Sequence, residues 1–308
     1  MFSVFLLLIL AVFIIFLSIK LSSYADYINN NTALSSLVVG GFLLAITTSL
    51  PEFFTALSAI YINNVPLAIG NIFGGNMFNI FMIIVFDLVF IKAFILKRTD
   101  KMFGVFIALL LLINLSYIFL NFFSVKLIIL PTIIIMIYLI YVKLISKLDL
   151  DTPKVRSKQI PYIKSKFFII SVTIIVLSIA LTLHTDNILH DFPMLSASAV
   201  GAYLLGICTS LPEIVMTFNL IKLKNYNLAL AGLLGANFFN LLIIAIIDLF
   251  FGVNVLQSIA TPEIMTLIIF GSMFYIIVLL KRELKWYKSL SVLAIVLYIV
   301  LFYLQFIV

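Results

Sequence analysis

Two short polar segments with the same sequence lie inside hydrophobic stretches of this chain. Thr48–Glu52 and Thr209–Glu213 both read Thr-Ser-Leu-Pro-Glu and are 161 positions apart. Carboxylate and hydroxyl oxygens are ligands that hard cations prefer. Proline has no N–H and disrupts a helix, so a carbonyl one turn earlier loses its partner and becomes a further oxygen ligand. Each pentad therefore predicts half of an ion site.

The glutamates carry most of this interpretation. A proline kink, with hydroxyls bonded to their own helix, would also explain the threonines, serines and prolines. It does not explain Glu52 and Glu213, because a carboxylate at the centre of a bilayer costs roughly 2.5–3.5 kcal/mol. Hydroxyls often join membrane helices, so they indicate an ion site less strongly. The hydroxyl candidates are Thr48, Ser49, Thr209 and Ser210.

A second polar element follows each pentad. Residues 70–79 and 231–240 combine small residues with asparagines. Small residues allow close helix packing, and Asn79 and Asn240 are the candidate amide ligands. Asn76 and Asn237 are equally well explained by hydrogen bonds between helices. Together the elements offer oxygen ligands and two negative charges, without a His or Cys cluster, which suits Ca²⁺ and its 6–8 oxygen ligands.

The two elements belong to an internal duplication. Residues 40–90 align without a gap with residues 201–251, and 21 of the 51 aligned positions are identical. Asp87 and Asp248 also match, near the ends of their hydrophobic segments. An interfacial carboxylate and a role in an ion vestibule both remain open for this pair. The chain consists of two homologous halves.

The composition predicts a membrane protein. Apolar residues make up 65% of the chain, charged residues 10%, and the mean hydropathy is +1.31, which leaves too little polar surface for a soluble globule. Ten segments are long enough to cross the hydrocarbon core. They lie near 2–19, 33–61, 67–91, 102–122, 125–146, 167–184, 194–221, 228–252, 263–280 and 287–307.

We expect an all-α membrane protein with ten transmembrane helices in two inverted five-helix repeats, with interrupted helices at the repeat interface. An odd number of spans in each half gives the halves opposite polarity, as in many secondary transporters. The first repeat is residues 1–146, with motifs at 40–90, and the second is 167–308, with motifs at 201–251. Residues 147–166 form a cytoplasmic linker.

Basic residues predict the orientation. With the N-terminus outside, 18 of the 19 Lys and Arg residues fall in inner loops, the positive-inside pattern. Both termini are then extracytoplasmic, and the protein is a multi-pass protein of the cell membrane. The net charge of +7 is explained by loops beside anionic lipid. We expect the lipid bilayer as a partner, and neither nucleic acid nor a protein partner.

The motifs resemble the alpha-repeats of the cation/calcium antiporter superfamily, most closely those of prokaryotic sodium/calcium exchangers. The resemblance rests on the pentads, on the Gly-x-Asn-x-x-Asn stretches from Gly74 and Gly235, and on their repetition. It implies that both glutamates bind Ca²⁺ and Na⁺ alternately, with hydroxyl and amide oxygens completing the site. It also implies backbone ligands at Ala45 and Gly206.

Two departures from this family pattern concern the ligands. Gly75 and Ala236 stand where the family usually has serine, a sodium ligand. Asn240 is neutral where several prokaryotic members have aspartate. The site then holds two formal charges rather than three, and its Na⁺ coordination lacks two hydroxyls.

The expected function is antiport of Ca²⁺ against Na⁺ by alternating access, without a cofactor and without enzymatic activity. An exchanger of H⁺ for Ca²⁺ or another divalent cation, using the same glutamates, is the nearest alternative. A cation channel is more remote, because its simplest form is a symmetric oligomeric pore rather than an inverted monomer. An intramembrane hydrolase would need a paired-Asp or His-Glu-x-x-His core, and neither is present.

The orientation predicts the labelling of single cysteines. A cysteine placed at 186–191 is expected to react with a membrane-impermeant reagent from outside, because this segment follows an outward-running span. One placed at 154–158 reacts only after permeabilisation, because the basic linker lies inside. Reversed labelling would overturn the orientation but not the ion site.

Overall fold

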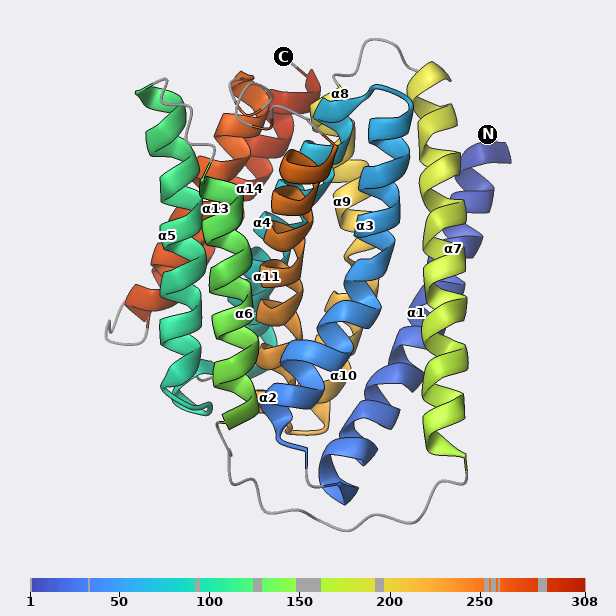
Figure 1. Ribbon diagram of the computed structural model, residues 1–308, viewed down its shortest axis with the longest axis vertical. Coiled ribbons are helices and arrows are strands. Elements are labelled where there is room, and N and C mark those ends of the chain that lie inside the picture. The colour runs from blue at the N-terminus through green and yellow to red at the C-terminus, as the bar shows by residue number, and fades with distance from the viewer. Residues whose placement is uncertain are drawn as a thin grey trace.

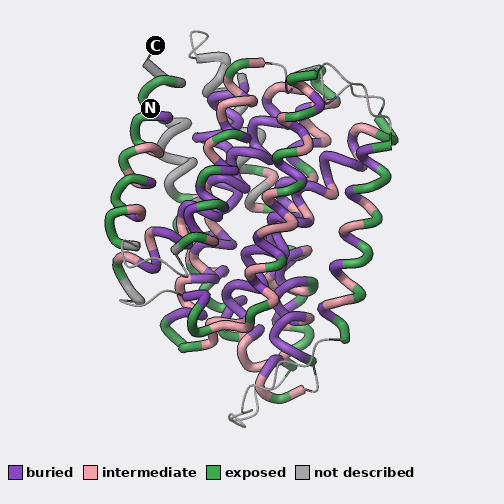
Figure 2. The backbone as a smooth tube through the Cα atoms, turned by 90° about the vertical axis from the view of Figure 1, so that its left-hand side faces the viewer, coloured by how far each residue is buried: buried purple, intermediate pink, exposed green. Residues whose placement is uncertain are grey.

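The structure is a computed structural model. It describes residues 2–32, 34–91, 95–123, 129–147, 162–191, 197–251, 255, 259, 261–281 and 287–307. Within these ranges all regular secondary structure is helical, and the helices form an elongated bundle (Figure 1). The bundle buries the central helices and leaves the outer faces of the peripheral ones exposed (Figure 2).

The helices of the two halves follow one another in the same order. The first half contains α1 (Phe2–Asn31), α2 (Ser36–Val38), η1 (Val39–Leu44), α3 (Ala45–Tyr61), α4 (Val65–Phe86), η2 (Asp87–Ile91), η3 (Ile95–Lys97), α5 (Met102–Phe122) and α6 (Leu130–Lys147). The second half contains α7 (Ile163–Asp191), α8 (Ala197–Ala199), η4 (Val200–Leu205), α9 (Gly206–Thr209), α10 (Leu211–Lys222), α11 (Tyr226–Phe250), α13 (Pro262–Lys281) and α14 (Tyr287–Ile307).

Equivalent helices run in opposite directions, as inverted repeats require. In Figure 1, α3 rises and α4 descends, whereas α10 descends and α11 rises. Each of the ten expected segments contains helix. Among the described residues, six helices are long and apolar enough to cross a membrane, and the bent pair Val200–Thr209 and Leu211–Lys222 makes up to a seventh. Ten spans therefore stays a prediction.

The two ends of the bundle differ in charge. Both chain termini lie at the upper end in Figure 1, whereas α6 ends and α7 begins at the lower end. Lys147 and Lys222 are the last residues of α6 and α10, which end there. Most of the linker, as well as Lys92 and Lys126, lies outside the described residues. The orientation in the membrane remains a prediction.

Two predicted segment ends are wrong. The segment expected to end near residue 19 continues as α1 to Asn31, so Lys20 lies inside a helix rather than in a loop. The segment expected to end at residue 184 continues as α7 to Asp191, so residues 186–191 are helical rather than a loop. Residues 186–191 include Ile188 and Leu189, and the first proline after residue 184 is Pro193. The sequence therefore contains no proline that would end the helix earlier. The labelling test is unchanged, because α7 ends at the same end of the bundle as the N-terminus (Figure 1).

The centre of the bundle joins the two halves. The pentad helices are α3 and α10, and the amide-rich helices are α4 and α11. η1 and α3 pack on α11 of the other half, and η4 and α9 pack on α4. α1 and α7 pack on each other and on the pentad helices, while α13 covers α4 and α5, and α6 packs on α11. The pentads therefore face each other across the repeat interface.

Glycines allow this close approach. A Cβ on Gly40 would lie 2.7 Å from both the Ala231 Cβ and the Leu228 carbonyl oxygen, and one on Gly201 would lie 2.5 Å from the Leu67 carbonyl oxygen. Such distances are below ordinary contact, so only glycine fits. The symmetric pair of contacts holds η1 against α11 and η4 against α4.

Polar residues at equivalent positions of the two halves cap the starts and the ends of the central helices. The Asn64 and Asn225 side chains accept hydrogen bonds from the backbone N–H groups of Leu67 and Leu228, both at 3.3 Å, and so cap the amide-rich helices. At the opposite ends, Asp87 accepts from the Ile95 N–H at 2.8 Å.

Asp248 repeats the role of Asp87, accepting from the Val255 N–H at 3.4 Å. Each aspartate therefore ties the segment after its helix to the helix end. This supports the structural reading of the pair over a place in an ion vestibule.

The irregular backbone differs between the halves. η1 and η4 are both π-helical, and each leads into a pentad. In the second half Ser210 separates α9 from α10, and the two pieces of the segment are bent by 46°. In the first half α3 continues through Pro51. The irregularity of that half is concentrated in η1, which ends about two turns before the proline.

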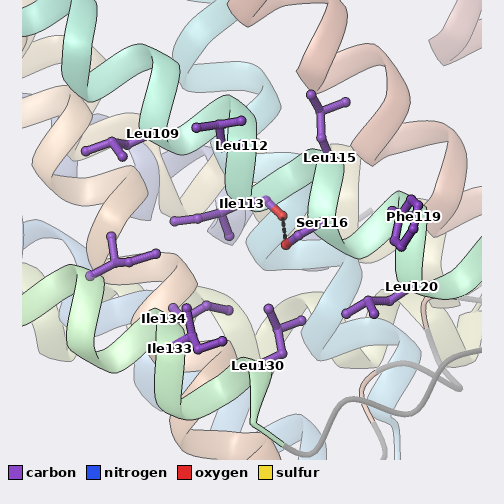
Figure 3. Close-up of a pocket in the computed structure, with 11 residues that line it drawn as sticks. Leu109, Leu112, Ile113, Leu115, Ser116, Phe119, Leu120, Leu130, Ile133 and Ile134 are labelled. Carbon is purple, nitrogen blue, oxygen red and sulfur yellow. Dashed lines mark hydrogen bonds between the residues drawn. The ribbon is translucent and has the colours of Figure 1, made fainter.

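An apolar groove of about 690 Å³ lies between α5 and α6, away from the repeat interface (Figure 3). Leucine, isoleucine and phenylalanine side chains line it, and the Ser116 hydroxyl donates to the Ile113 carbonyl of its own helix at 2.7 Å. The groove therefore offers an ion one hydroxyl at most, and its chemistry suits hydrocarbon.

The close approach of the halves predicts different effects of one methyl group at two glycines. Gly40→Ala is expected to lower the melting temperature in detergent, because the added Cβ meets α11 at 2.7 Å and overpacking typically costs about 1–3 kcal/mol. Gly232→Ala is the matched control, since its Cβ would meet nothing closer than 3.8 Å. Equal melting temperatures for both variants would contradict the packing described.

Candidate ion-binding site

The two pentad glutamates are completely buried. Glu52 lies in α3 and Glu213 in the first turn of α10, and both are 0% exposed. Neither oxygen of Glu52 has a hydrogen-bond partner among the described residues, nor has Glu213 Oε2. Glu213 Oε1 accepts one hydrogen bond, from the Ser49 hydroxyl at 3.3 Å. A buried carboxylate with so few donors is costly unless it binds a cation or a proton.

A ring of four asparagines connects the amide-rich helices. Asn76 Nδ2 donates to the Asn237 carbonyl at 3.2 Å, and Asn237 Nδ2 donates to the Asn76 carbonyl at 3.3 Å. Asn79 Nδ2 donates to Asn237 Oδ1 at 2.9 Å, and Asn240 Nδ2 donates to Asn76 Oδ1 at 3.0 Å. The amide oxygens of Asn79 and Asn240 are buried and accept nothing. The network thus uses the N–H groups and leaves two oxygens available to an ion.

The pentad hydroxyls also leave oxygen lone pairs available. Thr48 Oγ1 donates to the Leu44 carbonyl at 3.0 Å, and Thr209 Oγ1 donates to Asn71 Oδ1 at 3.2 Å. Ser210 Oγ is buried without a partner. A hydroxyl has one hydrogen and two lone pairs, so each threonine, with its hydrogen already engaged, can accept or ligate with the rest.

The two candidate backbone ligands stand at matching junctions. Ala45 is the first residue of α3, directly after η1, and Gly206 is the first residue of α9, directly after η4. Their carbonyl oxygens lie 3.5 Å from the hydroxyls of Thr48 and Thr209, respectively. Gly206 O already accepts from the Ser210 N–H at 3.1 Å, but a carbonyl has a second lone pair for an ion.

These oxygens form a site that suits a hard cation. Among the described residues, its buried oxygen atoms without a hydrogen-bond partner are three carboxylate oxygens, two amide oxygens and one hydroxyl oxygen. The described residues contain no group of three or more His, Cys, Asp or Glu side chains that could hold a metal. The formal charge is therefore set by two carboxylates, which balances one divalent ion or two monovalent ions.

Gly75, one of the two residues without the expected hydroxyl, also borders this cluster. A Cβ on Gly75 would lie 2.9 Å from Ser210 Oγ and 3.7 Å from the Gly206 carbonyl oxygen. A serine at position 75 would thus place a hydroxyl beside two of the predicted ligands. Ala236, its counterpart in the duplication, is likewise fully buried.

One polar residue near the site was not among the predicted ligands. Asn71 is 0% exposed and contacts Thr209. The duplication contained a signal for it, because Asn71 is matched by Gly232 and is therefore an asymmetric feature of an otherwise repeated helix.

Comparison with known proteins identifies the family. A family model described as sodium/calcium exchanger protein matches residues 2–147 and 166–307. This chain belongs to the sodium/calcium exchanger family. A search of curated proteins finds no match. Membership confirms the resemblance seen in the motifs and makes the chain a multi-pass membrane exchanger rather than an enzyme.

Solved exchanger structures share the fold. The sodium/calcium exchanger from Methanococcus jannaschii is 18% identical, with a TM-score of 0.65 over 97% of this chain and 96% of that one. Its form NCX_Mj soaked with Na⁺ and Sr²⁺ is 18% identical, with a TM-score of 0.67 and 97% of each chain covered. At this identity the comparison shows the fold, including the inverted repeats, and not the ligands.

The buried glutamates predict how ions affect stability. In ion-free buffer, Glu52→Gln and Glu213→Gln are expected to melt at or above the temperature of the unmodified protein, because the nearly isosteric amide removes a buried charge. Added Ca²⁺ should raise the melting temperature of the unmodified protein by mass action and leave both variants unchanged.

Glu263→Gln, which changes a partly buried carboxylate at the start of α13, serves as the control and should respond to Ca²⁺ like the unmodified protein. Equal stabilisation of either pentad variant by Ca²⁺ would remove that glutamate from the site.

Proposed function

We propose that this chain exchanges Ca²⁺ for Na⁺ across the cell membrane by alternating access, with the two ions competing for Glu52 and Glu213. The observation that carries the proposal is a pair of fully buried carboxylates, three of whose four oxygens have no donor within the described part of the chain. Family membership supports exchange as the activity. The similar exchanger NCX_Mj was studied with Na⁺, Ca²⁺ and Sr²⁺.

Charge balance accounts for obligatory exchange. Two bare carboxylates at membrane depth are costly, so the empty site disfavours the rearrangement that moves it from one side to the other. One Ca²⁺ or two Na⁺ neutralise the pair. Each loaded form can then cross, and because the two ions use the same oxygens they exclude one another.

The interface between the halves supplies the movement. Ligands come from α3 and α4 of the first half and from α10 and α11 of the second, and each pentad helix packs on the amide-rich helix of the other half. A shift of one half against the other would therefore open the cluster to one side while keeping both glutamates within it, as in transporters built from inverted repeats.

Exchange of H⁺ for Ca²⁺ is the second candidate. It is favoured by Gly75 and Ala236, which remove hydroxyls that the family resemblance assigns to Na⁺. Protons need only the carboxylates, and Glu52 has both oxygens without a donor. The two candidates differ in the driving ion and not in the site.

Uptake of ⁴⁵Ca²⁺ into proteoliposomes separates the candidates. An outward Na⁺ gradient at equal pH should drive uptake, and an outward H⁺ gradient without Na⁺ should drive little. Vesicles with Glu213→Gln provide the background, and a Na⁺ ionophore should abolish the Na⁺-driven signal. Uptake driven by the H⁺ gradient alone would replace Na⁺ with H⁺ in the proposal.

Serine substitutions test the missing hydroxyls. Gly75→Ser with Ala236→Ser is expected to strengthen the Na⁺ dependence of Ca²⁺ flux, because the new hydroxyl at position 75 lies beside Ser210 Oγ and the Gly206 carbonyl. If the added ligands convert a two-for-one cycle to three Na⁺ per Ca²⁺, one net charge moves, worth about 2.3 kcal/mol per 100 mV. Flux measured at imposed potentials shows this change.

Gly75→Ala with Ala236 unchanged is the matched control, because it adds the Cβ at position 75 without a hydroxyl. Steep, electrogenic Na⁺-driven flux in the unmodified protein would show that the serines are dispensable here.

A further inference from the structure

The hydroxyls of the two pentad threonines are held in different ways. In the first half, Thr48 Oγ1 donates along its own helix to the Leu44 carbonyl at 3.0 Å. The equivalent bond, from Thr209 to the Leu205 carbonyl, is not among the hydrogen bonds of the described residues. Instead, Thr209 Oγ1 donates across the repeat interface to Asn71 Oδ1 at 3.2 Å. Its distance to the nearest carbonyl of its own helix, Gly206, is 3.5 Å, at the limit for a hydrogen bond.

The backbone after the two threonines also differs. Thr209 is the last residue of α9, and Ser210 separates it from α10 with a bend of 46°. Thr48 lies inside the continuous helix α3. With the Gly206 carbonyl at 3.5 Å, the Thr209 hydroxyl makes its shorter hydrogen bond to an acceptor on another helix, Asn71 of α4.

The duplication shows the same asymmetry in sequence. In the second half, Gly232 occupies the position equivalent to Asn71. The threonine of the opposite half, Thr48, has a backbone acceptor in its own helix. Close packing does not require that glycine, because an added Cβ would meet nothing nearer than the Met216 Cε at 3.8 Å. The amide is therefore present beside the threonine that, among the described residues, lacks the bond to the carbonyl four residues back.

The environment of Asn71 also speaks against a role in packing alone. The side chain is 0% exposed, and its Nδ2 has no partner among the described residues. Among the described residues, the Asn71 side chain therefore takes part in one hydrogen bond, which its Oδ1 accepts from Thr209. An apolar residue would fill this position without burying an unsatisfied N–H group.

We propose that Asn71 is a positioning residue for the ion site: it takes the hydrogen of the Thr209 hydroxyl, so that the oxygen lone pairs of Thr209 face the cation held by Glu52 and Glu213. This inference rests on the proposed function. Without the bond, the hydroxyl is free to rotate and to turn its hydrogen toward the ion. Partners that orient a metal ligand typically contribute 10–100-fold to affinity.

A double-mutant cycle on Ca²⁺ binding tests the proposal. Equilibrium ⁴⁵Ca²⁺ binding should show that Asn71→Ala raises the Kd for Ca²⁺ about 10-fold. In a Thr209→Val background, which lacks the hydroxyl but keeps the shape, Asn71→Ala should change the Kd less than about 2-fold, because the bond is already gone. In a Thr48→Val background the full 10-fold effect should remain.

Two further variants keep the test decisive. Thr209→Ser retains a hydroxyl, so Asn71→Ala should still cost about 10-fold in that background. Gly232→Ala, at the equivalent position of the other half, should leave the Kd unchanged. Each variant is compared by its melting temperature in ion-free buffer, and in transport assays Asn71→Ala should raise the KM for Ca²⁺ while the maximal rate stays within about 2-fold.

The outcomes separate the two proposals. An equal cost of Asn71→Ala in the Thr209→Val and Thr48→Val backgrounds would overturn the positioning role and indicate that Asn71 acts on the ion directly. No effect of Asn71→Ala in any background would overturn it as well. Absence of Ca²⁺ binding by the unmodified protein would instead overturn the proposed function, together with this inference.

Discussion

The structure depends on the burial of two negative charges in a medium that opposes them. Glu52 lies within α3 and Glu213 in the first turn of α10; both are fully buried, and three of their four oxygens have no hydrogen-bond donor among the described residues. In a membrane such charges are stable only when a cation or proton joins them. The surrounding elements position oxygens that a cation can use, and do not neutralise the carboxylates with donors.

The directions of the hydrogen bonds follow this constraint. Within the asparagine ring, the amide N–H groups donate to another asparagine or, in the case of Asn237, also to the Tyr275 hydroxyl, which leaves the oxygens of Asn79 and Asn240 free among the described residues. The threonine hydroxyls donate to a carbonyl in one half and to an amide in the other. A cluster whose hydrogens are engaged elsewhere and whose oxygens keep their lone pairs has the chemistry that the proposed cation site requires. The glycines that bring the halves together make this arrangement possible, because the ligands come from both of them.

The internal repeat and the two buried glutamates could be predicted from the sequence. Shared Glu, Asn and Pro at one fixed offset predicted the repeat, and burial energetics indicated the glutamates, because a carboxylate has few structural uses in a membrane. Gly40 and Gly201 could be aligned but not explained from sequence, since their role is the distance between two helix backbones far apart in the chain. The end of α7 was missed because hydropathy marks where a segment becomes polar and not where its helix stops.

Asymmetry between the halves was the hardest feature to predict. The same pentad forms a continuous helix around Pro51 and a break at Ser210, so local sequence does not determine the backbone there. The residues that flank the two pentads differ, and so do the helices that pack on them. Asn71 acquires its partner only through that packing, and its difference from Gly232 could be read as a signal only once the two threonines were seen to differ.

Competition between the two ions tests the central claim most directly. Equilibrium binding of ⁴⁵Ca²⁺ to the purified protein should be measured at increasing Na⁺ concentration, with ionic strength held constant by a large organic cation. We expect Na⁺ to raise the Kd for Ca²⁺ progressively and to leave the number of Ca²⁺ sites unchanged, because both ions need Glu52 and Glu213. A Kd for Ca²⁺ that does not change with Na⁺ would show that the ions do not share this site.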